Sequence, residues 1–279
     1  MTDSALHPFD RALALEADAR DADLFHGHTS ADYWNMVGPF GGITAATLLQ
    51  AVLRHPRLLG APVALTVNFA AAIEAGAFAV RATPIRTNRS TQHWLLQLSQ
   101  VDGDGVEQVS TTGTAVTALR RETWSELDLA RPQATAPAQT PPLNTSGKGV
   151  AWAQQYEMRA IDGAFPSTWD GSGEHSRTRL WLRDAQSRAL DFPALAAMSD
   201  IFYPRVWLRR ATPVPAGTVS ITTYFHTDAA QLAEVGSGYL LGDARGQAFR
   251  NGYFDQAAEL WSEAGELLAT SNQIVYYKQ

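Results

Sequence analysis

The hydrophobic positions of the chain change their period several times, and each change marks the edge of a predicted element. The segment GPFGGITAATLLQAVLRH (38–55) places apolar residues at helical spacing after a Pro and a Gly pair. Strand-like segments follow at 63–69, 77–87, 92–101 and 106–119. The sequence DGDG between the last two predicts a tight hairpin turn. The first half of the chain therefore predicts one buried helix followed by an antiparallel sheet.

The second half of the chain repeats this order. An apolar stretch at 191–202 is followed by strand-like segments at 218–227, 233–244, 249–261 and 266–277, and two further strands are predicted before it, at 149–161 and 178–184. VALTVNF in the first half aligns with VSITTYF in the second, and VSTTGTAV aligns with LATSNQIV at nearly the same offset. The two matches occur in the same order in both halves, and each half has its own predicted helix before the strands. This indicates a duplication.

A different composition separates the two halves. The segment RPQATAPAQTPPLNTSGK at 131–148 holds four prolines and no hydrophobic period, which is typical of a linker. We therefore predict an N-terminal repeat at 1–130, a linker at 131–148 and a C-terminal repeat at 149–279. A sheet wrapped around one central apolar helix is the hotdog arrangement, so the predicted fold is an α+β double hotdog. Its two sheets are expected to join by their edge strands into one continuous sheet.

Composition restricts the chemistry. The chain of 279 residues has no cysteine, which excludes disulfides, Cys-based zinc sites and Cys nucleophiles. Its formal net charge of -6 disfavours nucleic acid as a partner. No apolar run reaches the roughly 18 residues of a membrane span, and the first residues carry acids throughout, so we expect a cytoplasmic protein without a membrane partner. The histidines form no metal-binding pattern, and we expect neither metal nor cofactor.

Familiar catalytic motifs are absent from the sequence. No serine has glycines two positions before and after it, and there is no HExxH and no P-loop. The glycines of GSGYLLG (236–242) have the wrong spacing for dinucleotide binding and favour a strand bulge instead. Asp21 precedes His26 at a hydratase-like spacing, but both lie in a polar stretch and are interpreted as surface residues.

Three short motifs in the second half carry a family resemblance. Asp200 follows a Ser near the end of the second predicted helix, Thr218 lies eight residues before His226 in TVSITTYFH, and Gln273 ends the sequence ATSNQ. In this order, and with FGG at 40–42, the chain resembles the bacterial acyl-CoA thioesterase II family. The resemblance implies a double hotdog hydrolase of fatty acyl-CoA, with Asp200, Thr218 and Gln273 as its catalytic residues.

These three residue types suit thioester hydrolysis. The reaction needs a water at the carbonyl carbon, an acceptor for its proton and donors for the oxygen that becomes negative. An Asp can accept the proton, while a Thr hydroxyl and a Gln amide can hold and direct the water, so no acyl-enzyme is required. Taken singly, Thr218 and Gln273 also fit ordinary strand positions, and Asp200 also fits an exposed helix end. His226 is expected to support the fold or to face solvent.

The remaining candidates concern substrate binding. Backbone N–H groups at a helix start can polarise a carbonyl oxygen, although the glycines here also fit a role in simply starting the helix. Apolar side chains between sheet and helix would hold the acyl chain. An Arg cluster would bind a polyanionic ligand, whereas any single Arg, including Arg205, is more often a solvated surface charge. The candidates are Gly41, Gly42, Arg89, Trp94, Phe202 and Tyr203.

Two other functions fit the same fold. Hotdog proteins also include enoyl-CoA hydratases and dehydratases, which use a His with an Asp or Glu facing the pocket, and no such pair lies on the predicted central helices. A non-catalytic acyl-CoA binding protein is the other alternative. With the leading hypothesis we expect a role in fatty acid metabolism and a homo-oligomeric assembly.

Overall fold

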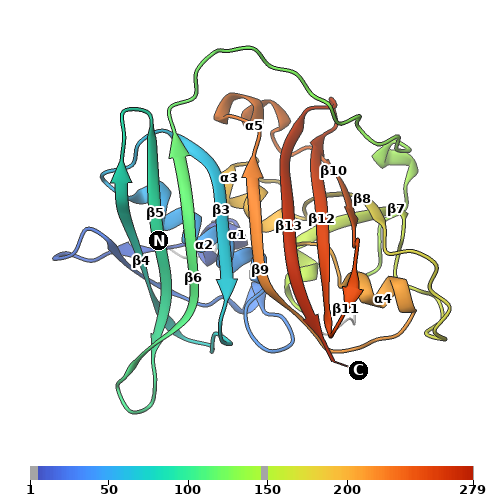
Figure 1. Ribbon diagram of the computed structural model, residues 1–279, viewed down its shortest axis with the longest axis horizontal. Helices are drawn as coiled ribbons and strands as arrows, with labels where there is room; N and C mark the ends of the chain where they lie inside the picture. The colour runs from blue at the N-terminus through green and yellow to red at the C-terminus, as the bar shows by residue number, and fades with distance from the viewer. Residues whose placement is uncertain (1–5, 146–149, 279) are drawn as a thin grey trace. The chain divides into compact units, whose positions relative to one another are not determined.

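The computed structural model describes residues 6–145 and 150–278, which form two compact units (Figure 1). Unit 1 takes its described residues from Met1–Arg120, Thr145–Gln155 and Asp191–Met198. Unit 2 takes its described residues from Arg121–Asn144, Tyr156–Leu190 and Ser199–Gln279. The second predicted helix therefore belongs to unit 1, although most of the C-terminal repeat forms unit 2. None of the described helices is long and apolar enough to cross a membrane.

Unit 1 is an antiparallel sheet against one main helix. The helix α2 (Gly41–Arg54) is buried over most of its circumference because its residues are almost all small or apolar, as a central helix requires. The strands follow the order β1-β2-β4-β5-β6-β3. Their bounds are β1 (Glu16–Ala17), β2 (Leu24–His28), β3 (Ala61–Phe69), β4 (Ala77–Thr87), β5 (Thr91–Val101) and β6 (Glu107–Ala118). The shorter helical elements are α1 (Pro8–Ala12), η2 (Ala31–Tyr33) and η4 (Trp152–Gln155).

The four strands predicted after the first helix are confirmed, and so is the DGDG hairpin. Asp102 Oδ1 accepts hydrogen bonds from the backbone N–H groups of Asp104 at 3.0 Å and Val106 at 2.9 Å. Gly105 adopts a φ of 80°, which an L side chain rarely tolerates. The turn chemistry therefore fixes how β5 and β6 pair.

The second predicted helix is shorter than its apolar pattern. Helix α3 (Phe192–Met198) has seven residues, and the chain then forms a turn at residues 199–200. Pro204 follows, and a proline disfavours helix at the residue before it, so the apolar residues at 201–203 continue outside the helix. The next helix, α4 (Arg205–Arg210), begins immediately after this proline.

Unit 2 is a second antiparallel sheet, in the order β9-β13-β12-β10-β8-β7, with β11 paired to β12. Its inner face carries Gln273 and Phe254, and α4 contacts it at β12. Its strands are β7 (Tyr156–Asp162), β8 (Thr178–Asp184), β9 (Ala216–Phe225), β10 (Leu240–Arg245), β11 (Phe249–Arg250), β12 (Tyr253–Ser262) and β13 (Leu267–Tyr277).

Three predicted strands differ from the structure by more than two residues at one end or are divided. The predicted strand at 233–244 begins as the end of helix α5 (Ala229–Val235), which starts at the capping box of Asp228 with Gln231. Gly236 ends that helix with a φ of 57°, so the strand bulge predicted at 236–242 is wrong. A turn at Asn251 and Gly252, both with positive φ, divides the segment 249–261 into β11 and β12. The strand predicted at 149–161 begins only at 156, and residue 149 lies outside the described residues.

The predicted linker packs on the outer face of unit 2. Trp181 donates its indole N–H to the carbonyl oxygen of Thr135 at 2.7 Å, and Arg159 donates to those of Pro137 at 3.0 Å and Thr140 at 2.9 Å. A short helical turn, η3 (Pro137–Gln139), lies within this segment. Residues 146–148 of the linker lie outside the described residues. The proline-rich composition thus yields a fixed strap up to Asn144.

Glu157 on β7 organises the groups that hold this strap. Burial alone would raise the pKa of Glu157, but hydrogen bonds from Tyr239, Arg183 and Arg159 outweigh it and lower the pKa from 4.5 to about 2. Because the folded pKa is depressed, the stabilisation is present above pH 4.5 and is lost as the pH falls toward 2.

We predict that Glu157→Gln lowers the free energy of unfolding by about 2 kcal/mol at pH 7, a value reduced for the partial exposure of the side chain. At pH 2.5 the two proteins should differ much less, because the carboxyl group is then protonated in the unfolded chain and ionising it in the native state stabilises the fold less. Urea unfolding at both pH values measures this. Glu263→Gln, in the exposed turn between β12 and β13, is the control. An equal loss of stability at both pH values would contradict the assignment.

Candidate active site

Asp200 lies in the turn that directly follows α3. The turn is fastened to the C-terminal strand, because Ser271 on β13 donates its hydroxyl to the carbonyl oxygen of Ser199 at 3.3 Å. Asp200 itself is half-buried. The helix thus ends before the carboxylate, and a neighbouring strand defines the position of the turn that carries it.

Gln273 occupies an inward position of β13. Ser271, Gln273 and Val275 are buried while the residues between them are exposed, which is the alternation of a strand with one covered face. The side chain of Gln273 donates from Nε2 to Asp200 Oδ1 at 2.9 Å. A strand position and a turn that are far apart in sequence are thereby joined at one carboxylate.

A β-bulge brings Thr218 to the same face. Ile221 and Phe225 of β9 are buried, and strict alternation from them would put Thr218 on the outer face of the sheet. The register of β9 against β13 shifts between Thr218 and Ser220, which leaves Val219 as the extra residue of a bulge. The extra residue reverses the alternation, so Thr218 points inward.

The three predicted catalytic side chains form one hydrogen-bonded chain. Thr218 donates its hydroxyl to Gln273 Oε1 at 3.2 Å, and the Gln273 amide nitrogen donates to Asp200 Oδ1. Since the hydroxyl occupies the amide oxygen, the amide nitrogen is turned toward the carboxylate. The arrangement holds a carboxylate, a proton acceptor, in a defined orientation within unit 2. The catalytic roles of these residues stay a prediction.

His226 lies outside this chain. It follows the last residue of β9, is exposed, and pairs through Nε2 with the hydroxyl of Thr270 at 2.9 Å. Asp21 and His26 are the other pair considered from the sequence, and both lie near the surface of unit 1. Asp21 is in an ion pair with Arg81, and His26 Nε2 is hydrogen-bonded to Asp18 Oδ2 at 3.1 Å.

Two predicted substrate contacts lie in unit 1. The ring of Trp94 is fully buried, packs edge-on against His55, and donates its N–H to Thr117 Oγ1 at 3.1 Å. Arg89 is exposed in the turn between β4 and β5. The structure places neither residue in the hydrogen-bonded chain, and a role in substrate binding stays a prediction for both.

Phe202 and Tyr203 follow Asp200 and are both buried. A Cβ on Gly242 would lie 2.7 Å from the Phe202 ring, so this glycine makes room for the ring on the inner face. Tyr203 donates its hydroxyl to the carbonyl oxygen of Gly163 and stacks on Phe165 with the ring centroids 4.1 Å apart. Burial raises the pKa of the Tyr203 hydroxyl. These contacts fix the position of the segment that follows Asp200 in the sequence.

Arg205 corrects the interpretation of the arginines as surface charges. It is fully buried, and burial lowers its pKa to about 10. Its guanidinium donates to the carbonyl oxygens of Tyr203 and Ser176, each at 3.0 Å, and to Thr178 Oγ1 at 2.7 Å. Arg205 therefore ties the segment that follows Asp200 to β8, a role that the sequence pattern did not indicate.

Gly42, at the start of α2, has a packing role in unit 1. A Cβ on Gly42 would overlap the carbonyl oxygen of Ala197 in α3 and the ring of Phe40. The first N–H groups of α2 to bond within its turn are those of Ile43 and Thr44, both to Phe40. The N–H groups of Gly41 and Gly42 precede that turn, and their predicted use by a substrate stays a prediction.

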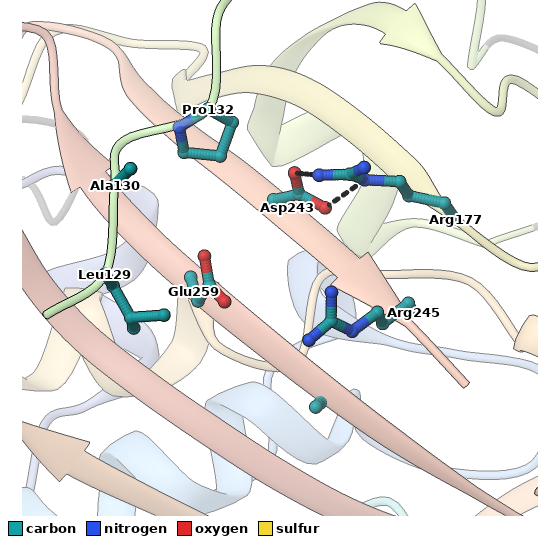
Figure 2. Close-up of a pocket in the computed structure, with 8 residues that line it drawn as sticks. Leu129, Ala130, Pro132, Arg177, Asp243, Arg245 and Glu259 are labelled. Atoms are coloured by element: carbon teal, nitrogen blue, oxygen red, sulfur yellow. Dashed lines mark hydrogen bonds and ion pairs between the residues drawn. The ribbon is translucent and has the colours of Figure 1, made fainter. Parts of the chain in front are cut away.

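A separate cavity of about 190 Å³ lies on the other face of the unit 2 sheet (Figure 2). Asp243 accepts hydrogen bonds there from Nε of Arg177 at 2.8 Å and of Arg179 at 3.0 Å. On β12 the cavity is lined by Ala257 and Glu259, which alternate with the inward residues. The cavity is therefore distinct from the hydrogen-bonded side chains of Asp200, Gln273 and Thr218.

Two family models match the sequence of this protein. Residues 130–277 match the family model described as the acyl-CoA thioesterase C-terminal domain, and residues 30–118 match the acyl-CoA thioesterase N-terminal domain. The chain belongs to the acyl-CoA thioesterase family. This confirms the resemblance found in the sequence motifs. In this thioesterase family member, all three residues of the hydrogen-bonded chain lie within the C-terminal match.

Solved structures confirm the double hotdog fold of this family member. A conserved protein of unknown function with a hot dog fold from Alicyclobacillus acidocaldarius is 46% identical, with 99% of both chains covered and a TM-score of 0.90. A putative thioesterase II from Thermobifida fusca is 18% identical over 99% of both chains, with a TM-score of 0.80. Acyl-CoA thioesterase II TesB2 from Mycobacterium marinum is 18% identical over 97% of this chain and 98% of its own, with a TM-score of 0.74. A search of curated proteins gave no match.

We predict that Gly42→Ala lowers the free energy of unfolding by about 1 to 3 kcal/mol, because the added methyl group forces α2 away from α3. Gly103→Ala is the matched control, since nothing lies within 4 Å of a Cβ at that position. Chemical denaturation of both variants measures the difference. Equal stability of the two variants would show that α2 and α3 are not packed this closely.

Proposed function

We propose that this chain hydrolyses a fatty acyl-CoA to the free acid and CoA, by direct attack of a water that Asp200 activates. The observation that supports the proposal is the chain of hydrogen bonds from Thr218 through Gln273 to Asp200. Membership of the acyl-CoA thioesterase family supports the substrate class.

In the proposed reaction the water oxygen forms a bond to the thioester carbonyl carbon while Asp200 takes a proton from the water. The π pair of the carbonyl moves to its oxygen. When this pair returns, the carbon–sulfur bond breaks and sulfur leaves with the bonding pair. The proton held by Asp200 passes to sulfur, which releases CoA as the thiol and restores the carboxylate.

Gln273 and Thr218 give the carboxylate its direction in this proposal. Gln273 holds Asp200 Oδ1, so the carboxylate keeps one orientation during proton transfer. Thr218 in turn fixes which way the Gln273 amide faces. A general base positioned in this way contributes about 10² to 10⁴ in rate, and a fixed water adds the advantage of proximity.

The finer aspects of substrate and setting are proposals as well. We assign the acyl chain to the apolar surfaces near Phe202 and Tyr203, with Trp94, Arg89, Gly41 and Gly42 as the other predicted contacts. A cytoplasmic location, a role in fatty acid metabolism and a homo-oligomeric assembly complete the proposal. Composition supports the location, family membership supports the role in fatty acid metabolism, and the exposed faces and edges of such sheets support the homo-oligomeric assembly.

Purified protein should release free thiol from members of a panel of short-, medium- and long-chain acyl-CoAs. Asp200→Asn should lower kcat about 100-fold or more, because the amide cannot accept the proton although it can still accept the bond from Gln273. Asp255→Asn, which changes a carboxylate on the outer face of the same sheet, should keep the wild-type rate. A colorimetric thiol assay measures all three proteins, and circular dichroism checks that they are folded.

Other outcomes would identify the alternatives. A wild-type protein that releases no thiol across the panel contradicts the proposal. Saturable acyl-CoA binding without turnover would indicate a binding protein, and hydration of an enoyl-CoA without thiol release would indicate a hydratase. Undiminished hydrolysis by Asp200→Asn would preserve the reaction but reject this site.

A further inference from the structure

Gln256 on β12 is a buried amide with an unused donor. Its side chain is 2% exposed, and its Nε2 makes no hydrogen bond among the described residues. Leaving a buried donor without a partner costs about 1 to 3 kcal/mol. A native protein that retains such a group needs another reason for it, and a ligand that accepts the bond provides one.

Gln92 shows how the same side chain is satisfied elsewhere in this chain. It is 1% exposed, and its Oε1 accepts from the backbone N–H of Leu59 at 2.8 Å. Its Nε2 donates to the carbonyl oxygen of Arg57 at 2.9 Å and to Thr87 Oγ1 at 2.8 Å. A glutamine can therefore be buried in this protein with its amide fully hydrogen-bonded. Gln256 differs, because its amide nitrogen has no partner among the described residues.

The position of Gln256 is beside the proposed catalytic residues. Gln256 and Gln273 are direct partners in the pairing of β12 with β13. Both are buried, so both side chains extend from the inner face. Directly opposed residues have Cβ atoms about 4.5 to 5.5 Å apart. The Gln256 side chain therefore begins next to that of Gln273, whose amide holds Asp200.

The three hydrogen-bonded side chains of Thr218, Gln273 and Asp200 offer few donors to the thioester carbonyl oxygen, which becomes negative in the reaction. Asp200 is an acceptor, and the single hydroxyl hydrogen of Thr218 is directed at Gln273. Gln273 uses one of its two amide hydrogens on Asp200. Hydrolysis requires donors where charge develops, and these contribute most when they are fixed in a buried site. Gln256 has two amide hydrogens for this purpose.

We propose that Gln256 is a further catalytic residue, whose Nε2 donates to the thioester carbonyl oxygen and stabilises the negative charge that forms on it. The inference rests on the proposed function. Gln256 makes and breaks no covalent bond. Its hydrogen bond strengthens when the π pair moves to the oxygen, and an interaction that is stronger in the transition state raises kcat.

The kinetic test compares Gln256→Met with Gln92→Met. Methionine has a similar length and no donor, so Gln256→Met should lower kcat about 10- to 100-fold and change KM by less than about threefold. Its melting temperature should not fall, because no hydrogen bond of Nε2 is lost and a buried unpaired donor is removed. Gln92→Met should do the opposite, with a lower melting temperature and an unchanged kcat.

A vibrational test reports on the bond itself. In an Asp200→Asn background the acyl-CoA that the wild type hydrolyses fastest is bound with ¹³C at its carbonyl carbon. Its carbonyl stretch in the infrared difference spectrum should lie below the solution value. Adding Gln256→Met should move it back toward that value, because the donor has gone. A purely structural role for Gln256 would leave the frequency unchanged.

The outcomes separate the two proposals. If Asp200→Asn abolishes hydrolysis while Gln256→Met keeps the wild-type kcat and carbonyl frequency, the inference about Gln256 is overturned and the proposed function stands. If Asp200→Asn hydrolyses at the wild-type rate, the proposed site fails first. A loss of melting temperature in Gln256→Met like that of Gln92→Met, with unchanged kcat, also overturns the inference.

Discussion

The hydrogen bond from the Gln273 amide to the Asp200 carboxylate is the interaction on which the site depends. It joins the last strand of the chain to the turn behind α3, and its length is 2.9 Å. Several other contacts serve its geometry. Ser271, two residues before Gln273, bonds the backbone of the same turn. Arg205 and Tyr203 fasten the segment that leaves the turn to β8 and to the carbonyl oxygen of Gly163. Because a proton acceptor works only at a defined distance and angle, this bracing matters for the proposed chemistry as much as the carboxylate does.

The β-bulge at Val219 is the second constraint. Without it, the alternation of β9 would turn Thr218 to the outer face, and the oxygen of the Gln273 amide would lose the hydroxyl that orients it. One extra residue in a strand thus determines which way an amide faces. Buried polar groups are tolerated when each has a partner. Among the described residues the amide nitrogen of Gln256 has none, and we infer that the substrate provides it.

Much of the fold follows from the sequence. The strand-like segments at 77–87 and 178–184 gave β4 and β8 with their observed bounds, and the small apolar residues after Gly42 predicted the buried helix α2. The limits of α3 were harder, because the apolar pattern continues past the residues that are helical and only Pro204 signals the end. Helix α5 was missed because its signal is a capping box at Asp228 within an otherwise strand-like segment. The strap at 131–144 was predicted as a linker because its hydrogen bonds use backbone carbonyls, which composition does not reveal.

The candidate site was predictable in part. Through family resemblance, the motifs around Asp200, Thr218 and Gln273 predicted three residues that the structure joins by hydrogen bonds, whereas alternation alone would have turned Thr218 outward. Gln256 carries no local motif. Its place beside Gln273 depends on the register of β12 and β13, which shifts by one residue near Leu260. The burial of Arg205 depends on the carbonyl oxygens of Ser176 and Tyr203 and on the hydroxyl of Thr178 in β8, and no pattern in the sequence indicates these contacts.

The central claim, that Asp200 activates a water which attacks the thioester directly, is tested most directly by a single turnover in ¹⁸O-labelled water with enzyme in excess over acyl-CoA. The account predicts that the released acid carries one ¹⁸O atom and that the peptide containing Asp200 carries none, as measured by mass spectrometry. Unlabelled acid from the first turnover, with ¹⁸O in the Asp200 carboxylate, would show that the carboxylate attacked the thioester itself and would contradict the account.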